Sequence, residues 1–304
     1  MRIPLTITLL VAAPALLAAQ TPSPPYVKPE RLRQISTHVH VIPDNSVPGV
    51  PNVGIIVGNA AVLVVDTGLG PPNGAKVLAE AQKLGGSRPL YLVTTHVHPE
   101  HDLGAQAFPA TSKLIRSIDQ NKDIAEFGLR LAQVFASRSP VHAELLKGAE
   151  FRKADITFER DYDLDLGGVR AHVVAMGANH TRGDTAVWIE ADRVLFAGDI
   201  AMKAQPAFAS PYSNLDHWLT SLDRLEKLKP AVIVPSHGPN GEGAAFIMAY
   251  RLYLTEVRDR TAAEKRAGRN VEQTTETVTA AMADRYPNRA RLAGAIKAAF
   301  AETR

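Results

Sequence analysis

The sequence contains no cysteine, and this absence excludes several kinds of chemistry at once. No disulfide can stabilise the fold, no thiolate can act as a nucleophile, and no thiolate can bind zinc. A catalytic or metal-binding site must therefore use other side chains. A chain of 304 residues with 45% hydrophobic residues is nevertheless long enough to bury a large core.

The sequence also lacks charge blocks and any apolar run long enough to span a bilayer. Lys and Arg are scattered and the formal net charge is only +3, so we expect a small-molecule substrate and no nucleic-acid partner. Residues 1–19, "MRIPLTITLLVAAPALLAA", join one basic residue, a short apolar run and small residues. This pattern predicts a cleaved signal peptide, a periplasmic or secreted protein, and no stable membrane insertion after cleavage. A retained anchor helix is the alternative, and the oligomeric state stays open.

The remaining chain alternates between strand-like and helix-like segments. A Pro-rich segment at 20–36 precedes β-branched runs such as "NVGIIVG" and "AAVLVVDTG", and a second group of such runs follows a helical stretch at about 117–148. We interpret 37–243 as one α/β domain with two packed sheets and helices outside. Residues 244–304 are predicted to form helices packed on this domain.

The densest motif is "THVHPEHDLG" at 95–104, where three histidines and a glutamate follow a predicted strand. His96 and His98 alternate and can point to one side, while Glu100 and His101 can face a second point. His180, Asp199 and His237 each follow another predicted strand. Imidazole and carboxylate groups gathered from strand ends suit zinc.

Five motifs in order, "VVDTG", "THVHPEH", "GANHTRGD", "AGDIA" and "PSHGP", resemble those of the metallo-β-lactamase superfamily across residues 52–241. The resemblance implies an αββα four-layer sandwich with an added C-terminal helical region and a site for two Zn²⁺ ions. It implies that His96, His98 and His180 bind the first ion, that Glu100, His101 and His237 bind the second, and that Asp199 bridges them. Asp66 would support the ligand loop. Glu100 stands where the family usually has Asp.

The resemblance implies a zinc-dependent hydrolase that cleaves an ester, lactone, thioester or cyclic amide, possibly a β-lactam, with Glu100 and Asp199 as catalytic residues. Together with the predicted signal peptide, it leads us to expect an exported enzyme. Zinc lowers the pKa of bound water from 15.7 to about 7, which removes the need for a protein nucleophile. Two alternatives remain open. One is an iron-dependent redox enzyme on the same fold, such as a persulfide dioxygenase, and the other is a metal-binding protein without catalysis.

The other histidines lack such partners. His38 and His40 belong to an earlier "THVH" with no acid and no third histidine after it, so structural or surface roles are expected. We expect the same of His142, His172 and His217. Lys203 is a weaker candidate for contact with a substrate carboxylate.

Overall fold

The computed structural model describes residues 23–203 and 212–302, so the expected signal peptide at 1–19 lies outside the described residues. Seven strands form the first sheet in the order of the chain. Pairing is antiparallel from the first to the fourth strand and parallel from the fourth onward. The strands are β1 (Arg33–Gln34), β2 (Val39–Ile42), β3 (Val53–Val57), β4 (Val62–Val65), β5 (Leu90–Val93), β6 (Lys113–Ser117) and β7 (Ile156–Phe158).

Six strands form the second sheet, again in chain order, and they follow the first seven without any exchange between sheets. All neighbouring strands are antiparallel except β11 and β12, which are parallel. The strands are β8 (Asp161–Asp165), β9 (Arg170–Gly177), β10 (Asp184–Ile189), β11 (Val194–Gly198), β12 (Val232–Pro235) and β13 (Gly241–Glu242).

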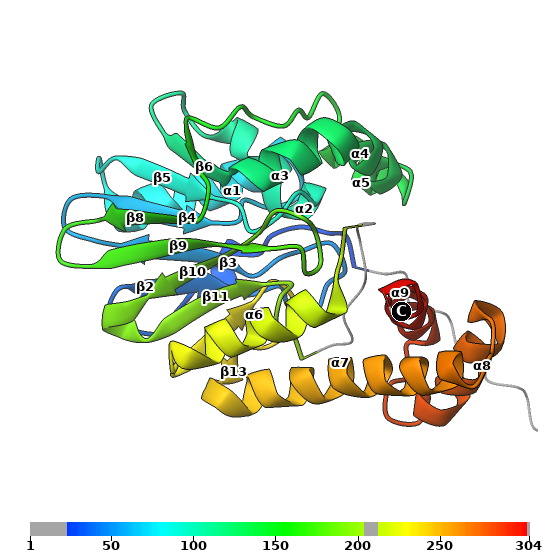
Figure 1. Ribbon diagram of the computed structural model, residues 1–304. Helices are drawn as coiled ribbons and strands as arrows, with labels where there is room; N and C mark the ends of the chain where they lie inside the picture. Colours follow the sequence, from blue (N-terminus) through cyan, green and yellow to red (C-terminus); the bar gives the residue numbers. More distant parts are fainter. Residues whose placement is uncertain (1–22, 204–211, 303–304) are drawn as a thin grey trace, which may run out of the picture.

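The two sheets pack face to face, and the alternation of side chains along each strand explains why their sequences are apolar throughout (Figure 1). In β4, Leu63 and Val65 enter the core between the sheets, while Val62 and Val64 enter the core under the helix on the outer face. β11 behaves in the same way in the second sheet. Each central strand is therefore buried on both faces.

Helices cover the outer face of each sheet. α1 (Gly70–Gly85) packs on the first sheet through Val77 and Ala81, and α6 (Leu215–Lys227) packs on the second through Trp218 and Leu222 (Figure 1). The expected αββα sandwich is thereby confirmed. Short helices complete the connections: η1 (Pro29–Arg31), α2 (Pro99–Asp102), η2 (Leu103–Ala107) and η4 (Glu190–Asp192).

A helical insertion separates β6 from β7, in the region where the sequence predicts helix. It consists of four consecutive pieces, the third of which packs against α2 (Figure 1). They are α3 (Ile118–Asp123), the π-helix η3 (Ile124–Gly128), α4 (Leu129–Ala136) and α5 (Pro140–Leu145). Phe135, Leu145 and Leu146 bury this insertion against Leu69 and Leu103.

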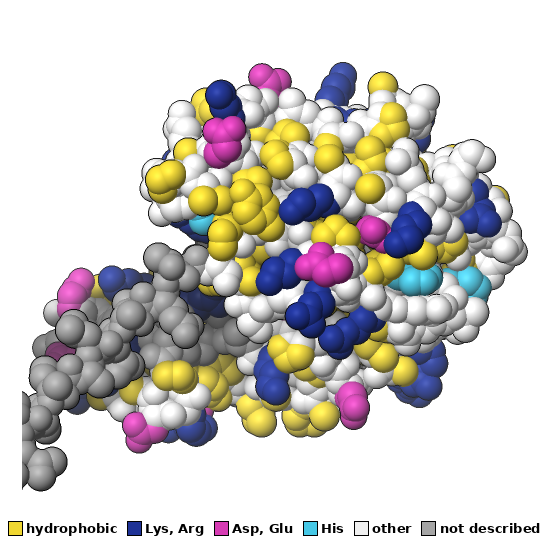
Figure 2. Space-filling model, turned by 180° about the vertical axis from the view of Figure 1, so that it is seen from behind, with side chains coloured by type: hydrophobic (Ala, Val, Ile, Leu, Met, Phe, Trp, Pro, Cys, Tyr) yellow, Lys and Arg dark blue, Asp and Glu magenta, His cyan; other side chains and the backbone are white. Residues whose placement is uncertain are grey.

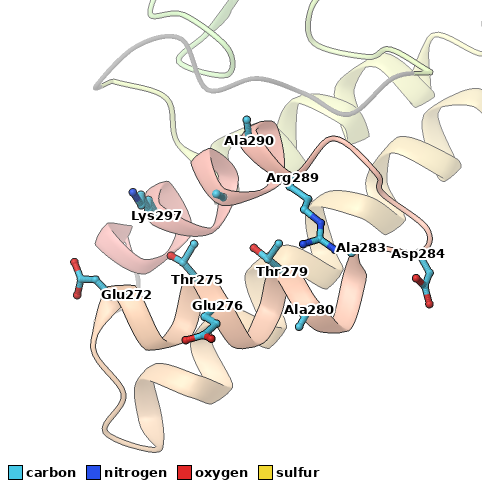
Figure 3. Close-up of a pocket in the computed structure, with 11 residues that line it drawn as sticks. Glu272, Thr275, Glu276, Thr279, Ala280, Ala283, Asp284, Arg289, Ala290 and Lys297 are labelled. Atoms are coloured by element: carbon cyan, nitrogen blue, oxygen red, sulfur yellow. The ribbon is translucent and has the colours of Figure 1, made fainter. Parts of the chain in front are cut away.

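The C-terminal helices are α7 (Gly243–Arg266), α8 (Val271–Met282) and α9 (Arg289–Glu302). Their apolar side chains share one core with α6 and the outer face of the second sheet. A surface groove of about 820 Å³ lies between α8 and α9 and is lined by small residues and by charged ones such as Glu276 and Lys297 (Figure 3). None of its lining residues belongs to the histidine cluster.

The surface agrees with the dispersed charge of the sequence. On the face shown in Figure 2, Lys and Arg side chains lie scattered among uncharged ones, with Asp and Glu between some of them. Within residues 23–203 and 212–302, no helix is both long enough and apolar enough to cross a membrane.

Candidate metal centre

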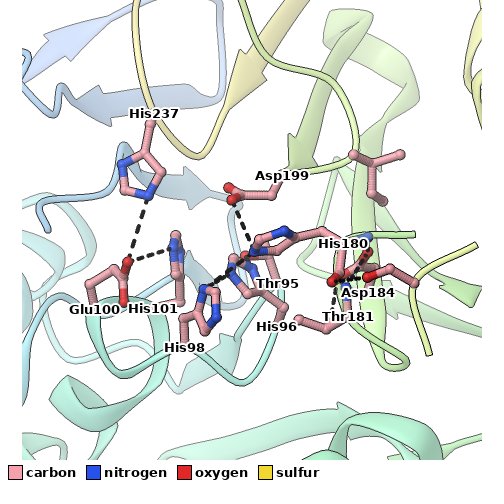
Figure 4. A network of polar contacts seen from close by, with 12 residues as sticks. Thr95, His96, His98, Glu100, His101, His180, Thr181, Asp184, Asp199 and His237 are labelled. Carbon is pink, nitrogen blue, oxygen red and sulfur yellow. Dashed lines mark hydrogen bonds and ion pairs between the residues drawn. The ribbon is translucent and has the colours of Figure 1, made fainter. Parts of the chain in front are cut away.

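The seven residues named by the sequence motifs meet at one end of the sandwich, where several strands finish (Figure 4). β5 leads into the loop of His96 and His98, and α2 then carries Glu100 and His101. The later strands β9, β11 and β12 are followed by His180, Asp199 and His237, respectively. The structure therefore brings together all seven side chains, from segments up to 141 residues apart.

His96, His98 and His180 form the first group. His98 Nδ1 lies 3.1 Å from His96 Nε2 and 3.3 Å from His180 Nε2. Two of these rings, His96 and His180, are almost completely buried. Three imidazole nitrogens directed at one another make a suitable site for a cation that accepts their lone pairs.

Glu100, His101 and His237 form the second group. Glu100 Oε1 lies 4.0 Å from His101 Nε2 and 3.9 Å from His237 Nε2. His101 Nδ1 lies 2.7 Å from Asp66 Oδ2, and His237 Nδ1 lies 3.0 Å from the carbonyl oxygen of Val50. Since these oxygens accept a hydrogen bond from Nδ1–H, the neutral rings keep a free lone pair on Nε2, directed toward Glu100.

Asp199 lies between the two groups, with Oδ2 3.2 Å from His180 Nε2. Its other oxygen, Oδ1, is buried without a hydrogen-bond partner, and so are Glu100 Oε2 and His101 Nε2. Buried polar atoms are rarely left unpaired, because each one costs free energy of desolvation. Three such atoms in one cluster fit the presence of metal ions as their missing partners.

The electrostatics of the first group favour neutral imidazoles. Burial, reinforced by neighbouring histidines, lowers the pKa of both His96 and His98 well below 6.5. Burial would raise the pKa of Asp199, but His180 and His237 outweigh it and hold that pKa below its ordinary range. Neutral imidazoles and an ionised carboxylate are the forms that bind metal.

His101 behaves differently because of Asp66. Burial lowers the pKa of His101, but the adjacent Asp66 carboxylate outweighs burial and raises that pKa to about 9. A cation that binds Nε2 must therefore displace a proton. Asp66 also accepts hydrogen bonds from the backbone N–H and the hydroxyl of Thr95, and it has a positive φ of 62° that Asp tolerates better than most residues. The expected supporting role of Asp66 is visible in these contacts.

Sequence reasoning did not identify two other carboxylates that hold the ligand loops. Asp184 accepts hydrogen bonds from the backbone N–H of His180 at 2.6 Å and from the Thr181 hydroxyl at 2.5 Å. Asp102 forms a two-pronged pair with Arg116, at 2.8 Å to Nε and 2.5 Å to Nη2. Both acids occur inside the quoted motifs, at the fourth residue after His180 and directly after His101, which is the only signal that the sequence offers.

Two neighbours of His180 complete its surroundings. The Ser213 hydroxyl donates to the His180 carbonyl oxygen at 2.7 Å. The Trp218 ring centroid lies 6.4 Å from that of His180, and its indole N–H donates to the Ile200 carbonyl oxygen at 2.7 Å. The start of α6 thus forms a wall behind the first group.

The remaining histidines lie outside these groups. His38 Nδ1 lies 2.7 Å from Asp192, His172 Nδ1 lies 2.6 Å from Asp163, and His217 Nε2 lies 2.7 Å from the Met176 carbonyl oxygen. His40 lies in β2 and is half-buried. Lys203 is exposed and forms no ion pair with the part of the chain that the structure describes.

The fold and this cluster define a protein that holds a divalent metal at the end of an αββα sandwich. Residues 46–237 match the family model of the metallo-beta-lactamase superfamily. Because this match covers more than half of the chain, the protein belongs to that superfamily.

The names of similar curated proteins point to different substrates. Acyl-coenzyme A thioesterase MBLAC2 of Gallus gallus is 28% identical over 189 residues, which make up 58% of this chain and 67% of the relative. The human protein of that name is 24% identical over 191 residues, with the same coverage. Linear primary-alkylsulfatase of Pseudomonas sp. (strain ATCC 19151) is 21% identical over 210 residues, only 39% of its own length. The family and these relatives indicate a hydrolase in general.

Solved structures confirm the fold. A metallo-beta-lactamase from Pontibacter korlensis has a TM-score of 0.56 at 21% identity, covering 74% of this chain and 98% of that one. The stereoselective inverting sec-alkylsulfatase Pisa1 from Pseudomonas sp. has a TM-score of 0.67 at 15% identity, covering 88% of this chain and 49% of that one. An 88% share is larger than the part of the chain that precedes α7, so this second likeness extends into the C-terminal helices.

Proposed function

We propose that the protein is an exported zinc-dependent hydrolase that binds two Zn²⁺ ions and cleaves an ester, lactone, thioester or cyclic amide. One observation carries the proposal: three buried atoms without partners, on Glu100, His101 and Asp199, lie within a cluster of imidazole nitrogens. His96, His98 and His180 would hold one ion, Glu100, His101 and His237 the other, and Asp199 would contact both.

Zinc in these groups would supply hydroxide near neutral pH and polarise the bond to be cleaved. The protein's own residues would orient and transfer protons. Asp66 and the Val50 carbonyl fix the rings of His101 and His237 with Nε2 toward Glu100. The Glu100 carboxylate has two oxygens, so the one that does not hold the ion would accept a proton from the attacking water.

Among these substrate classes we favour a thioester. The support is that the two thioesterases have a higher sequence identity to this chain than the alkylsulfatase has, and are matched over about two thirds of their length. The name of the alkylsulfatase adds sulfate esters to the compounds worth testing.

The test combines metal analysis with kinetics on the full chain. We expect two zinc ions per chain by mass spectrometry, and hydrolysis of one or more of an acyl-coenzyme A, S-lactoylglutathione, an acyl-homoserine lactone, nitrocefin and an alkyl sulfate. His98→Ala is expected to lose metal and at least about 100-fold in kcat/KM. His172→Ala is the matched control, because His172 pairs with Asp163 outside both groups. Full activity of His98→Ala would contradict the assignment.

A third set of possible ligands makes iron the alternative metal to test against zinc. His96, His101 and Asp199 offer ligand atoms within 4.8 Å of one another, and two histidines with one carboxylate form the usual ligand set of non-haem iron oxygenases. The same preparation is therefore analysed for iron, and oxygen consumption is measured with a persulfide. Iron-dependent oxygen uptake without hydrolysis would replace the hydrolase proposal. Full metal loading without either activity would indicate a metal-binding protein.

The export part of the proposal rests on residues 1–19 alone. Amino-terminal sequencing of the protein from the producing cells checks it. A mature chain that starts near Gln20 in the periplasmic or extracellular fraction supports export, and an intact amino terminus in the cytoplasmic fraction contradicts it.

A further inference from the structure

The helical insertion forms one wall of the candidate metal centre. α4 packs against α2, the helix that carries Glu100 and His101. The Phe135 ring of α4 is buried, with its centroid 5.9 Å from that of His98. Phe135 therefore connects the helical insertion directly to a ligand of the first group.

Arg138 is such a side chain. Its guanidinium carbon lies 3.4 Å from the Phe135 ring centroid, a cation–π contact. The guanidinium carbon can therefore be no farther from the His98 ring centroid than 3.4 Å and 5.9 Å taken together. Arg138 forms no ion pair with any residue in the described ranges, whereas Arg116 and Arg182 each pair with an aspartate. The guanidinium is positioned by the ring, yet its charge is not neutralised.

His142 shows on which side of the centre this charge lies. His142, at the start of α5, lies against Gly49 of the loop that continues to Val50, the partner of His237. Burial lowers the pKa of His142, Arg138 lowers it further, and Glu100 acts in the opposite direction. Because His142 follows Arg138 by four residues and lies against the loop that leads to Val50, this end of the insertion borders the second group.

We infer that Arg138, held by Phe135, binds an anionic group of the substrate (a carboxylate, phosphate or sulfate) away from the bond that is cleaved. A guanidinium binds such oxyanions through paired, charge-assisted hydrogen bonds. That the bound molecule is a substrate rests on the proposed function. Binding of the anion itself does not depend on turnover. It gives the insertion a role in selectivity that the resemblance to the family does not supply.

The test is calorimetric, on the zinc-loaded full chain, with ligands that cannot react. Butyrate offers one carboxylate, whereas glutarate, 4-phosphonobutyrate and 4-sulfobutyrate add a second anion of three kinds. We expect at least one of the three to bind about tenfold more tightly than butyrate, and Arg138→Gln to remove that advantage while leaving butyrate affinity and zinc content unchanged. Arg138→Lys should restore part of it.

Arg130→Gln is the matched control, because Arg130 is exposed near the start of α4 and has no aromatic contact among the described residues. It should bind all four ligands as the unmodified protein does. If none of the three dianions binds better than butyrate, or if Arg138→Gln keeps the advantage, the inference is overturned. A failure to hydrolyse any substrate would refute the proposed function and leave this binding result standing.

Discussion

Glu100 is the residue at which this chain departs from its family, and the structure shows how the longer side chain is accommodated. α2 begins at Pro99, directly before Glu100, and the carboxylate reaches a point 3.9 Å from His237 Nε2 and 4.0 Å from His101 Nε2. These distances leave room for one ion among the three side chains. The backbone position of α2 therefore suits the extra methylene group of Glu.

Glu100→Asp should weaken metal binding in the second group about tenfold or more. Shortening the side chain withdraws the carboxylate from both imidazoles, while Asp66 and Val50 keep those rings in place. Zinc titration against a competing chelator measures both affinities, and that of the first group should not change. The control is Glu144→Asp on the exposed side of α5. An unchanged or higher second affinity would show that the longer side chain is not needed.

At this scale the motifs named the clustered residues and one supporting side chain, Asp66, but not the other side chains that hold the cluster. His180, Asp199 and His237 follow strands, so their convergence follows from strands ending at one edge. The partners of Asp102 and Asp184 are set by three-dimensional contacts instead. Asp102 faces Arg116, which lies fourteen residues away in β6, and no spacing rule predicts such a pair.

At the scale of elements, η2, α1 and the loop after β4 pack backbone against backbone, so closely that a Cβ atom at the contact points would overlap a neighbouring carbonyl group. Gly104 in η2 lies against the backbone of Thr67, and Gly74 in α1 lies against the backbone of Gly104. The Thr67 N–H and hydroxyl donate to the His101 carbonyl oxygen at 2.9 and 3.0 Å. Two glycines without side chains thus let the loop after β4 support the metal-binding helix α2.

Gly104→Ala should lower the free energy of unfolding by about 3 kcal/mol, since a methyl group would overlap the Thr67 carbonyl oxygen and backbone cannot move as a side-chain tip does. Urea unfolding measures this. Gly294→Ala in α9 is the matched control, because a methyl group there meets nothing within 4 Å and should stabilise by up to about 1 kcal/mol. Equal stabilities for the two variants would mean that the close approach has no energetic consequence.

The strands that the sequence failed to predict were missed for two reasons, polar side chains and short length. β6 carries the polar residues Lys113, Arg116 and Ser117, which do not indicate a buried strand. Arg116 is nevertheless only 1% exposed, because its charge is paired with that of Asp102. β1 and β13 are two residues long and too short for a period to show. Strands buried on both faces, such as β4 and β11, were predictable because burial on both faces makes every position apolar.

For the whole molecule, the C-terminal helices share a core with the sandwich. Leu254 in α7 is fully buried in the cluster that also contains Trp218, Leu222 and Ile296. Without α7, α8 and α9, this apolar surface over α6 would be open to water. The helices thus complete the outer layer of the second sheet, and the start of that layer forms the wall behind His180.

Leu254→Ala should lower the free energy of unfolding by about 2–5 kcal/mol, because it leaves a cavity in this shared core. Leu252→Ala on the same helix is the control: Leu252 is 60% exposed, so a change within about 0.5 kcal/mol is expected. Thermal or urea unfolding measures both. A fragment of residues 1–242 that unfolds at the same temperature as the full chain would show that the C-terminal helices do not contribute to this core.

Trp218, the neighbour of His180, can also serve as an intrinsic fluorescence probe of metal binding. The chain has only two tryptophans, and the ring of this one lies 6.4 Å from an imidazole of the first group. A paramagnetic ion such as Co²⁺ bound by His180 would quench the indole emission at that range. Replacing Trp188 with Phe leaves Trp218 as the single tryptophan, so filling of the metal centre becomes readable as fluorescence without a label.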